Sequence, residues 1–373
     1  MSINLQDVLT QIGPEIAERA AKHDAEDTLV LENFALLKAH KVIGAQVPVE
    51  LGGGGASHSQ MCDFLRQLAH HCGSTALAIS MNQHPIALNK WKYIHGKGGE
   101  PVLKKVAAHQ AIIVSSGGRD FLESNGTMER VEGGYRVTAK KAFCSGAGAG
   151  DLFATSAVYD HPDDGPQVLH FGIPMTSEGL VIEDVWKVHG MRGTGSNDIV
   201  LNGVFVPDGA VSLVRPRFVF PPAWKVVLTS ALPLFMGVYV GVAERAAQMA
   251  HERAQKRRLD PDMQSAIGLM DTELTIAQMA WRELVANANE LDFMPSDELA
   301  NAALIRKTLI ARSAIKTTEL AVQAVGGVGY FRGYGLERLL RDVRAGHYHP
   351  LPAAQQARFS GRLALGVNPI TGI

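Results

Sequence analysis

The first third of the chain has the spacing of apolar and polar residues that amphipathic helices show. In residues 5–25 and 31–45, apolar residues recur three and four positions apart with charged residues between them, which is the repeat of a helix with one buried face. Residues 73–94 are apolar on all sides, and this favours a helix inside the core. We therefore expect an N-terminal helical domain over residues 1–110.

The pattern changes at about residue 111, where short runs rich in Val, Ile, Phe and Tyr alternate with Gly, Asp and Pro. Such runs, including "AIIVSS", "LFATSAVY" and "DIVLNGVFVP", are typical of a β-barrel or sandwich. The stretch "VEGGYRV" predicts a hairpin that turns at Gly133 and Gly134, since glycines supply the positive φ angles of a tight turn. A central β-domain is expected over residues 111–215.

The last part of the chain returns to helical spacing, in segments long enough for a helical bundle over residues 216–373. Its most apolar stretch, residues 224–246, is interrupted by Lys225, Pro233 and Glu244. About 18 uninterrupted apolar residues would be needed to cross a membrane, so this stretch is predicted to be a buried core helix. We expect an α+β protein with an N-terminal helical domain, a β-domain and a C-terminal four-helix bundle.

Composition excludes some classes of function but does not identify the function itself. The 373 residues are 46% hydrophobic and 20% charged, with a net charge of -1, so no general field attracts nucleic acid or an anionic membrane. Three cysteines at irregular spacing predict free thiols in a reducing compartment, and no metal site is expected from the spacing of Cys and His. Because residues 1–30 lack a basic segment followed by an apolar run, we expect a cytoplasmic protein.

Two polar motifs in the β-domain could carry chemistry. In "KKAFCSGAGAG", the aromatic Phe143 precedes Ser145 at a strand end, a combination that can hold a flat ring. In "VHGMRGTGSND", a glycine-rich turn presents Arg192, Thr194 and Ser196, and several donors on one exposed loop suit a polar substrate. A capped hairpin is the simpler explanation of the second motif.

A third motif, "VQAVGGVGYFRGYGLERLLRD", lies near the end of the chain. Gly326 and Gly327 interrupt two predicted helices, which would let a phosphate or a neighbouring subunit approach the backbone. A plain turn between two helices explains the glycines equally well. At the end of this motif, Arg341 and Asp342 are predicted to form a structural ion pair.

In this order along the chain, the blocks 140–145, 190–207 and 323–366 resemble the acyl-CoA dehydrogenase superfamily. The resemblance implies a helical domain, a β-domain and a four-helix bundle, usually assembled as a homotetramer, with a flavin between the β-domain and the bundle. It also implies that Ser145 forms a hydrogen bond with the flavin ring and that Phe143 packs on that ring.

The resemblance assigns further flavin contacts. Ser115 and Ser116 fall in the second flavin-contacting strand, although "SSGGRDFLES" replaces the family's Thr-Glu-Pro and Gly-Ser-Asp. Arg257 matches the arginine that reaches the pyrophosphate of an FAD in a neighbouring subunit, a task suited to a guanidinium fork. The residues that match the segment contacting the adenosine end of that FAD are Gln323, Gly326 and Gly327. FAD is therefore the expected cofactor, with FMN as the alternative.

The usual catalytic base of the family is missing. In the dehydrogenases a glutamate follows the "RD" block, and here Pro350 stands in its place, beside His349. A second possible base position, on an earlier helix, corresponds to about Ala231. His84 lies on the helix that borders the substrate pocket in this family, so His84 and His349 are the catalytic candidates, because an imidazole exchanges a proton near neutral pH. A helix-capping role for His349 and a core role for His84 are the alternatives.

Two-component flavin monooxygenases of this superfamily lack the glutamate, use histidines near the flavin, and carry a "GxRGTGS" loop like residues 190–196. We therefore expect a monooxygenase that uses reduced flavin and O2 on a small aromatic or hydrophobic substrate, with a separate reductase as its partner. Two alternatives stay open. One is an acyl-CoA dehydrogenase with a displaced base, served by an electron-transfer flavoprotein, and the other is a flavin-binding homologue without catalysis.

Overall fold

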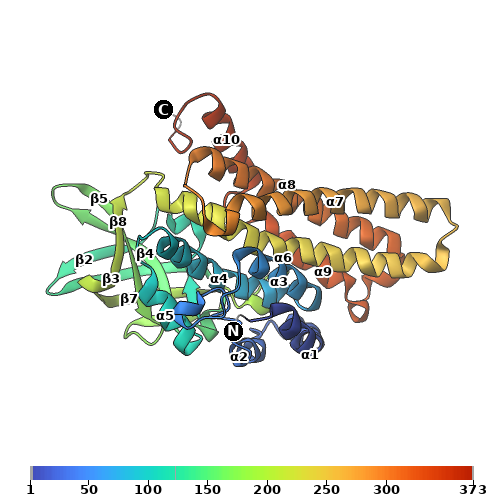
Figure 1. Cartoon of the computed structure of the whole chain (residues 1–373), viewed down its shortest axis with the longest axis horizontal. Helices are drawn as coiled ribbons and strands as arrows, with labels where there is room; N and C mark the ends of the chain where they lie inside the picture. The colour runs from blue at the N-terminus through green and yellow to red at the C-terminus, as the bar shows by residue number, and fades with distance from the viewer. Residues whose placement is uncertain (1–2, 122, 372–373) are drawn as a thin grey trace.

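The computed structural model describes residues 3–121 and 123–371. Helices form the N-terminal part of the fold, drawn in blue to cyan in Figure 1. They are α1 (Leu5–Glu26), α2 (Leu31–Ala39), α3 (His58–His71), α4 (Gly73–Ile94) and α5 (Glu100–His109). α3 begins at a capping box, in which Ser57 Oγ accepts from the Gln60 N–H and the Gln60 side chain accepts from the Ser57 N–H. α4 is buried along most of its length, as its apolar sequence predicts.

The central part is one mixed β-sheet, so the predicted α+β class is confirmed. Its strands are β1 (Ile113–Ser115), β2 (Thr127–Val131), β3 (Gly134–Cys144), β4 (Leu152–His161), β5 (Gly165–Pro174), β6 (Leu180–Glu183), β7 (Asn197–Pro207) and β8 (Val211–Pro216). The strand order is β6-β7-β3-β2-β4-β5-β8, and β1 pairs in parallel with β4. The predicted hairpin joins β2 to β3, but it turns at Glu132 and Gly133, one position earlier than expected. Gly133 has a φ of 73°, a conformation that favours glycine.

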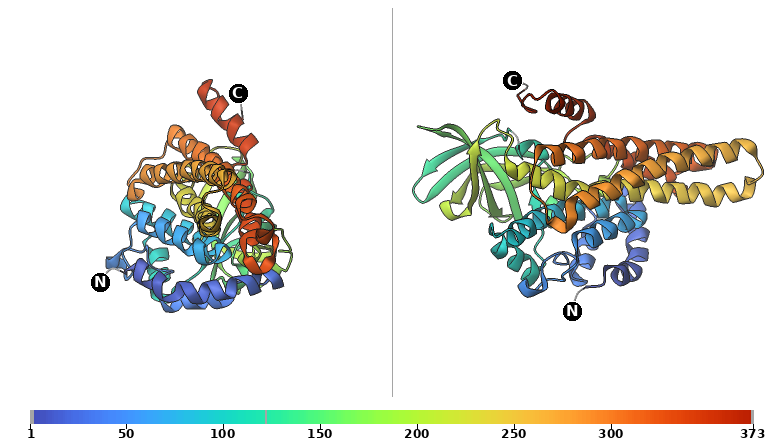
Figure 2. Two further views of the ribbon diagram at one scale, coloured as in Figure 1. Left: turned by 90° about the vertical axis from the view of Figure 1, so that its right-hand side faces the viewer. Right: turned by 45° about the horizontal axis from the view of Figure 1, so that its top comes forward.

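Long helices make up the C-terminal part and extend away from the sheet (Figures 1 and 2). They are α6 (Pro222–Ala254), α7 (Pro261–Ala288) and α8 (Asp297–Val325), followed by the shorter α9 (Leu336–Val343) and α10 (Ala353–Ala364). α9 packs against α6 and α8 as the short fourth member of the bundle. α10 contacts α8 and stands out from the rest of the fold (Figure 2). The predicted domain limits at residues 110 and 215 stay a prediction.

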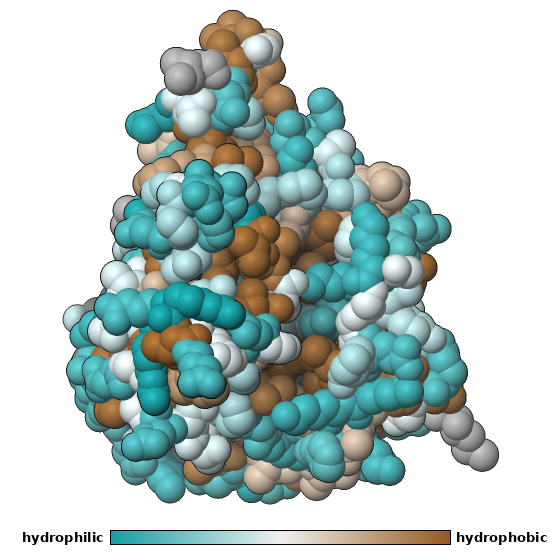
Figure 3. All heavy atoms as spheres, turned by 90° about the vertical axis from the view of Figure 1, so that its left-hand side faces the viewer, coloured by the Kyte–Doolittle hydropathy of each residue, from teal (hydrophilic) through white to brown (hydrophobic). Residues whose placement is uncertain are grey.

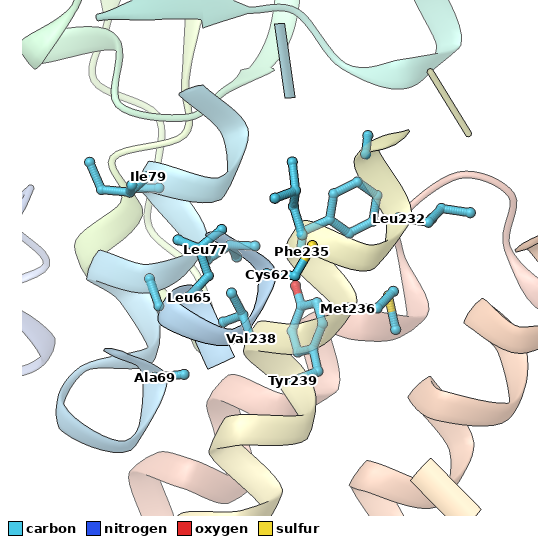
Figure 4. Packing of buried hydrophobic residues seen from close by; sticks show 14 of the residues in the cluster. Cys62, Leu65, Ala69, Leu77, Ile79, Leu232, Phe235, Met236, Val238 and Tyr239 are labelled. Carbon is cyan, nitrogen blue, oxygen red and sulfur yellow. The ribbon is translucent and has the colours of Figure 1, made fainter. Parts of the chain in front are cut away.

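α6 is the central helix of the core. By length and composition it could cross a membrane, but its apolar window is entirely buried inside the fold, so the predicted core helix is confirmed. Two glycines let neighbouring helices approach it closely, since an added Cβ would lie 2.0 Å from Arg66 O at Gly241 and 2.8 Å from Trp281 Nε1 at Gly237. Figure 4 shows side chains of α6 packed against those of α3 and α4.

A cluster of charges ties α1 to α9 and corrects one expectation. Arg341 contacts Asp24 at 2.6 Å and Glu337 at 2.7 Å. The Asp342 carboxylate is buried and accepts the Met191 N–H at 2.5 Å. The predicted Arg341–Asp342 ion pair is therefore wrong, because consecutive residues of a helix point in different directions. Burial raises the pKa of Asp342 to about 6.

Candidate functional site

The candidate site lies where α4, the end of β1 and the segment after α9 meet. The Gly117 N–H donates to Ala142 O at 3.0 Å, so the end of β1 lies beside the end of β3. The flavin contacts predicted on these two strands are therefore neighbours in space. The segment after α9 closes on the same place, because a Cβ added to Gly118 would lie 2.3 Å from Pro350 Cγ.

His84 projects from α4 towards β1. It is 8% exposed, and its Nε2 lies 2.9 Å from Ser115 Oγ. Its Nδ1 is buried and has no hydrogen-bond partner within the described residues. Burial lowers the pKa of His84 to about 4, so the imidazole is neutral at neutral pH. An unpartnered buried nitrogen is costly, and it offers a bonding position to a ligand in the site.

His349 enters the site from the other side. Its Nε2 lies 2.6 Å from the Tyr239 hydroxyl, and its ring stacks on Phe235 with centroids 4.6 Å apart. The residue as a whole is half-buried, and its ring is covered by the Phe235 and Tyr239 rings of α6. This burial, together with the positive charge of Lys307 and the nearby His84, lowers the pKa of His349 to about 3. Because Pro350 lies against Gly118 and His84 bonds to Ser115, both imidazoles lie near the end of β1.

Three hydroxyls connect the two motifs of the β-domain. Ser145 Oγ lies 2.8 Å from Ser196 Oγ, which lies 2.7 Å from Thr194 Oγ1. Thr194 Oγ1 donates to Met191 O at 2.9 Å. Because a hydroxyl has one proton to donate, Ser196 must donate to Thr194 and Ser145 to Ser196. Thr194 and Ser196 are buried, whereas Ser145 is partly exposed, so Ser145 can offer lone pairs to a ligand N–H.

Ser116 directly follows β1, and its hydroxyl has a different partner from that of Ser115. Its Oγ lies 2.8 Å from Thr155 Oγ1, which donates to Asp120 at 3.4 Å. Asp120 in turn pairs with the fully buried Lys141 at 3.2 Å. The Ser116 hydroxyl therefore belongs to the polar interior of the sheet, and its predicted contact with a flavin stays a prediction.

Phe143 presents an open aromatic surface at the end of β3. The side chain is 62% exposed, and the residue has a φ of 58°. Its ring meets the Trp186 ring edge-on, with centroids 6.0 Å apart. The surface seen from the sheet end is hollowed near its middle, and hydrophobic residues gather in and around the hollow (Figure 3). The exposed Phe143 ring, the Ser145 oxygen and the unpartnered His84 nitrogen fit a flat ring with polar edges.

The Arg192 guanidinium forms its contacts with groups of the same chain. Its guanidinium lies 3.4 Å from the Asp27 carboxylate and donates to Val188 O at 3.0 Å and to Asp24 O at 3.2 Å. These contacts fasten the glycine-rich loop to the end of α1. A direct role of Arg192 in substrate binding stays a prediction.

The remaining predicted cofactor contacts lie at the end of the bundle remote from the sheet (Figures 1 and 2). They are Arg257, Gln323, Gly326 and Gly327. Arg257 is exposed and pairs with Asp260, and nothing lies within 4 Å of a Cβ added to Gly326 or Gly327. The chain does not bring these residues to the histidines, so any role in cofactor binding would concern another subunit's site, as the resemblance implies.

Two stretches of the chain match models of known families. Residues 7–93 match "Acyl-CoA dehydrogenase, N-terminal domain", and residues 232–348 match "Acyl-CoA dehydrogenase, C-terminal domain". The chain belongs to the acyl-CoA dehydrogenase superfamily. The predicted resemblance is thereby confirmed, and with it the helix–sheet–helix order of the fold.

Proteins that are similar over most of the chain indicate which activities occur among its relatives. The chain is 26% identical to amino sugar nitrososynthase DnmZ of Streptomyces peucetius, over 97% of this chain and 93% of that protein. It is 26% identical to dibenzothiophene monooxygenase of Mycolicibacterium goodii, over 84% of this chain and 82% of that protein. The solved structure of KijD3 in complex with FMN and dTDP-3-amino-2,3,6-trideoxy-4-keto-3-methyl-D-glucose has a TM-score of 0.89 and 26% identity, and covers 98% of this chain and 94% of its own. This superfamily member is accordingly a flavin-dependent oxidoreductase, as predicted.

Three residues of the site were missed by the sequence analysis, namely Phe235, Tyr239 and Lys307. The first two lie within the apolar run of α6, where an aromatic residue is ordinarily a core residue. Lys307 lies among charged and apolar residues of α8 and carries no pattern that distinguishes it. The hydroxyl of Tyr239 within this apolar run is the one signal that could have been used, since a buried hydroxyl needs a partner.

Proposed function

We propose that this protein is a flavin-dependent monooxygenase that uses reduced flavin and O2 to oxygenate a small aromatic or hydrophobic substrate. The observation that carries the proposal is the pair of neutral imidazoles, His84 and His349, at a site that lacks the dehydrogenase carboxylate. Pro350 stands at one predicted base position and cannot accept a proton. The other position, Ala231, is buried and has no ionisable group.

The chain's own groups supply hydrogen bonds and protons. When bound, reduced flavin would supply the two electrons with which O2 is divided, so that one oxygen atom enters the substrate and the other leaves as water. Burial raises the pKa of Tyr239 well above its usual value, so the phenol stays protonated and would serve as the hydrogen-bond donor to His349 Nε2. A neutral imidazole that accepts at Nε2 carries its proton on Nδ1. His349 can therefore donate at Nδ1, and the Nδ1 of His84 has no partner within the part of the chain that the structure describes.

Phe143 and Ser145 would hold the flavin ring. Because Ser145 donates its one proton to Ser196, its oxygen is left to accept a hydrogen bond from the flavin. A reduced flavin has more ring N–H groups to donate than an oxidised one. This agrees with a protein that receives its flavin already reduced by a separate reductase. FMN, the expected alternative to FAD, gains support because KijD3, 26% identical to this chain, was solved with FMN. We also propose a homotetramer in the cytoplasm, in which the exposed Arg257 meets a neighbouring subunit.

A second candidate reaction is the N-oxygenation of a nucleotide-linked amino sugar. The chain matches two amino sugar nitrososynthases over 95% or more of its length, DnmZ and RubN8 of Streptomyces rubradiris, the latter with 29% identity. The same histidines would serve this reaction, because it also divides O2 and needs a hydrogen-bond donor beside the oxygen that leaves. The two candidates differ in whether the substrate carries a primary amine.

Oxygenase and dehydrogenase activities can be separated by two measurements on flavin-loaded protein. In the first, the oxidised protein is mixed anaerobically with acyl-CoA thioesters, and we expect no bleaching of the flavin. In the second, the protein is supplied with reduced flavin, ¹⁸O2 and either thiophenes and indoles or dTDP-linked amino sugars. We expect one ¹⁸O atom in a product from one of these panels. Rapid bleaching by a thioester would contradict the proposal and favour the dehydrogenase.

A further inference from the structure

Lys307 is a buried lysine that the proposed reaction does not use. It lies on α8, is 1% exposed, and its Nζ donates to His347 O at 3.3 Å and to Leu351 O at 3.2 Å. These carbonyl groups stand two residues before and two residues after His349. One ammonium group therefore bridges both ends of residues 347–351, the segment that carries the candidate catalytic imidazole.

Because burying an ammonium group is costly, Lys307 is expected to do more than fill space in the core. Within the part of the chain that the structure describes, Lys307 forms no ion pair with an acidic side chain, and its Nζ bonds to the two carbonyl groups. Burial lowers the pKa of Lys307 to about 8, which reflects the cost of removing the charge from water. A methionine at this position of α8 would avoid that cost. The lysine is therefore best explained by what it does to the segment.

We propose that Lys307 is a positioning residue that holds His349 in the site by tying residues 347–351 to α8. The catalytic consequence rests on the proposed function, whereas the tie itself does not. Three other contacts hold the segment through its side chains, since Tyr239 bonds to His349 Nε2, Phe235 stacks on the His349 ring, and Pro350 lies against Gly118. Lys307 is the contact that acts on the backbone of the segment, on both sides of the imidazole at once.

The charge of Lys307 also acts on the imidazole. After burial, it is the largest cause that lowers the pKa of His349, ahead of His84. The other titratable or charged groups around the segment are Tyr239 on α6, Glu319 on α8, and Arg344 and His347 after α9. Replacement of Lys307 by a neutral residue should therefore raise the pKa of His349.

The test compares Lys307→Met with Lys316→Met, which removes an exposed lysine from the same helix. Hydrogen exchange of residues 344–352 should become about tenfold faster or more in Lys307→Met and stay unchanged in Lys316→Met. The Tyr348 amide, which donates to Ala345 O at 3.0 Å, is the reporter. Titration of the His349 imidazole by NMR should show a higher pKa in Lys307→Met alone.

Two further variants make the result decisive. Lys307→Arg keeps the charge and the donors, and should restore most of the exchange protection. If Lys307→Met does not fold, Lys307→Gln replaces it, because this shorter neutral side chain cannot reach both carbonyl groups. Unchanged exchange and an unchanged His349 titration in whichever variant folds would overturn the proposal. Neither measurement needs a substrate. The proposed role of Lys307 can therefore be disproved without affecting the proposed oxygenase function, and the reverse also holds.

Discussion

The histidine site and the far end of the bundle differ in whether their functional groups find partners within the same chain. At the histidine site, His84 Nε2 and His349 Nε2 both bond to groups of the same chain, and the segment after α9 is held from several sides. At the far end, Arg257 is exposed, and open space surrounds Gly326 and Gly327. The first region is formed by internal packing, whereas the second presents a cation and bare backbone outwards. The second region is thus open to contact from outside the chain, as the proposed role of Arg257 at a neighbouring subunit would require.

The largest expected effect comes from removing an imidazole of the completed site. His349→Ala should lower oxygenation by about 100-fold or more, since a positioned hydrogen-bond donor in a buried site contributes roughly that much. Flavin binding and the fold should persist, because the Phe143 and Ser145 contacts remain. His347→Ala is the matched control, because it is exposed and only its backbone carbonyl meets Lys307. Wild-type rates in His349→Ala, measured by ¹⁸O incorporation, would remove this residue from the mechanism.

The histidine site should also make stability depend on pH. His84 has a pKa of about 4 in the folded protein and about 6.5 when unfolded. The unfolded chain therefore binds more protons between these values, so stability is complete above pH 6.5 and falls as the pH drops towards 4. This one group could account for up to about 3 kcal/mol.

Urea unfolding at pH 7 and pH 4.5 checks this expectation. His84→Gln cannot titrate, and its loss of stability between the two pH values should be smaller than that of the wild type. An equal loss in both proteins would mean that other groups cause the acid sensitivity and that His84 is better hydrated than its burial implies.

Two glycines test the contrast directly. Gly118→Ala would place a Cβ 2.3 Å from Pro350 Cγ, so it should cost about 1–3 kcal/mol of stability through overpacking and displace the His349 segment. Gly327→Ala meets nothing within 4 Å and should leave the stability of the isolated fold unchanged. If a neighbouring subunit or a bound FAD approaches there, Gly327→Ala should instead weaken assembly or FAD binding.

Thermal unfolding, light scattering and FAD titration separate these outcomes. The expected pattern is a lower Tm with normal assembly for Gly118→Ala, and a normal fold with weaker assembly or FAD binding for Gly327→Ala. Unchanged assembly and unchanged FAD binding in Gly327→Ala would show that the far end of the bundle faces only solvent.

The period of apolar residues was enough to predict α6 as a buried helix and the sheet as a separate part of the chain. It could not reveal that Tyr239 and Lys307 meet the segment of His349, because each looks like an ordinary helix residue in the sequence. Their contact depends on how α6, α8 and the segment after α9 pack. The ion pair predicted for Arg341 failed for the same reason, since its true partner, Asp24, lies on α1, far away in the chain.

Substitution of Arg257 should have the smallest effect on stability, but it best distinguishes FAD binding from FMN binding. Its ion pair with Asp260 is exposed, so Arg257→Ala should change the free energy of unfolding by less than about 1 kcal/mol. If Arg257 reaches the pyrophosphate of FAD in a neighbouring subunit, the variant should bind FAD more weakly while its affinity for FMN, which has no pyrophosphate, stays the same. Arg258→Ala, an exposed neighbour, is the control.

Titration of both flavins into the wild type and the two variants distinguishes the possible results. A loss confined to FAD in Arg257→Ala would mean that the open end of the bundle completes the site of another subunit. An equal loss for FAD and FMN would place Arg257 at the phosphate that the two cofactors share. No loss for either would leave this end of the bundle without a role in cofactor binding, and would make the histidine site of a single chain sufficient for FMN.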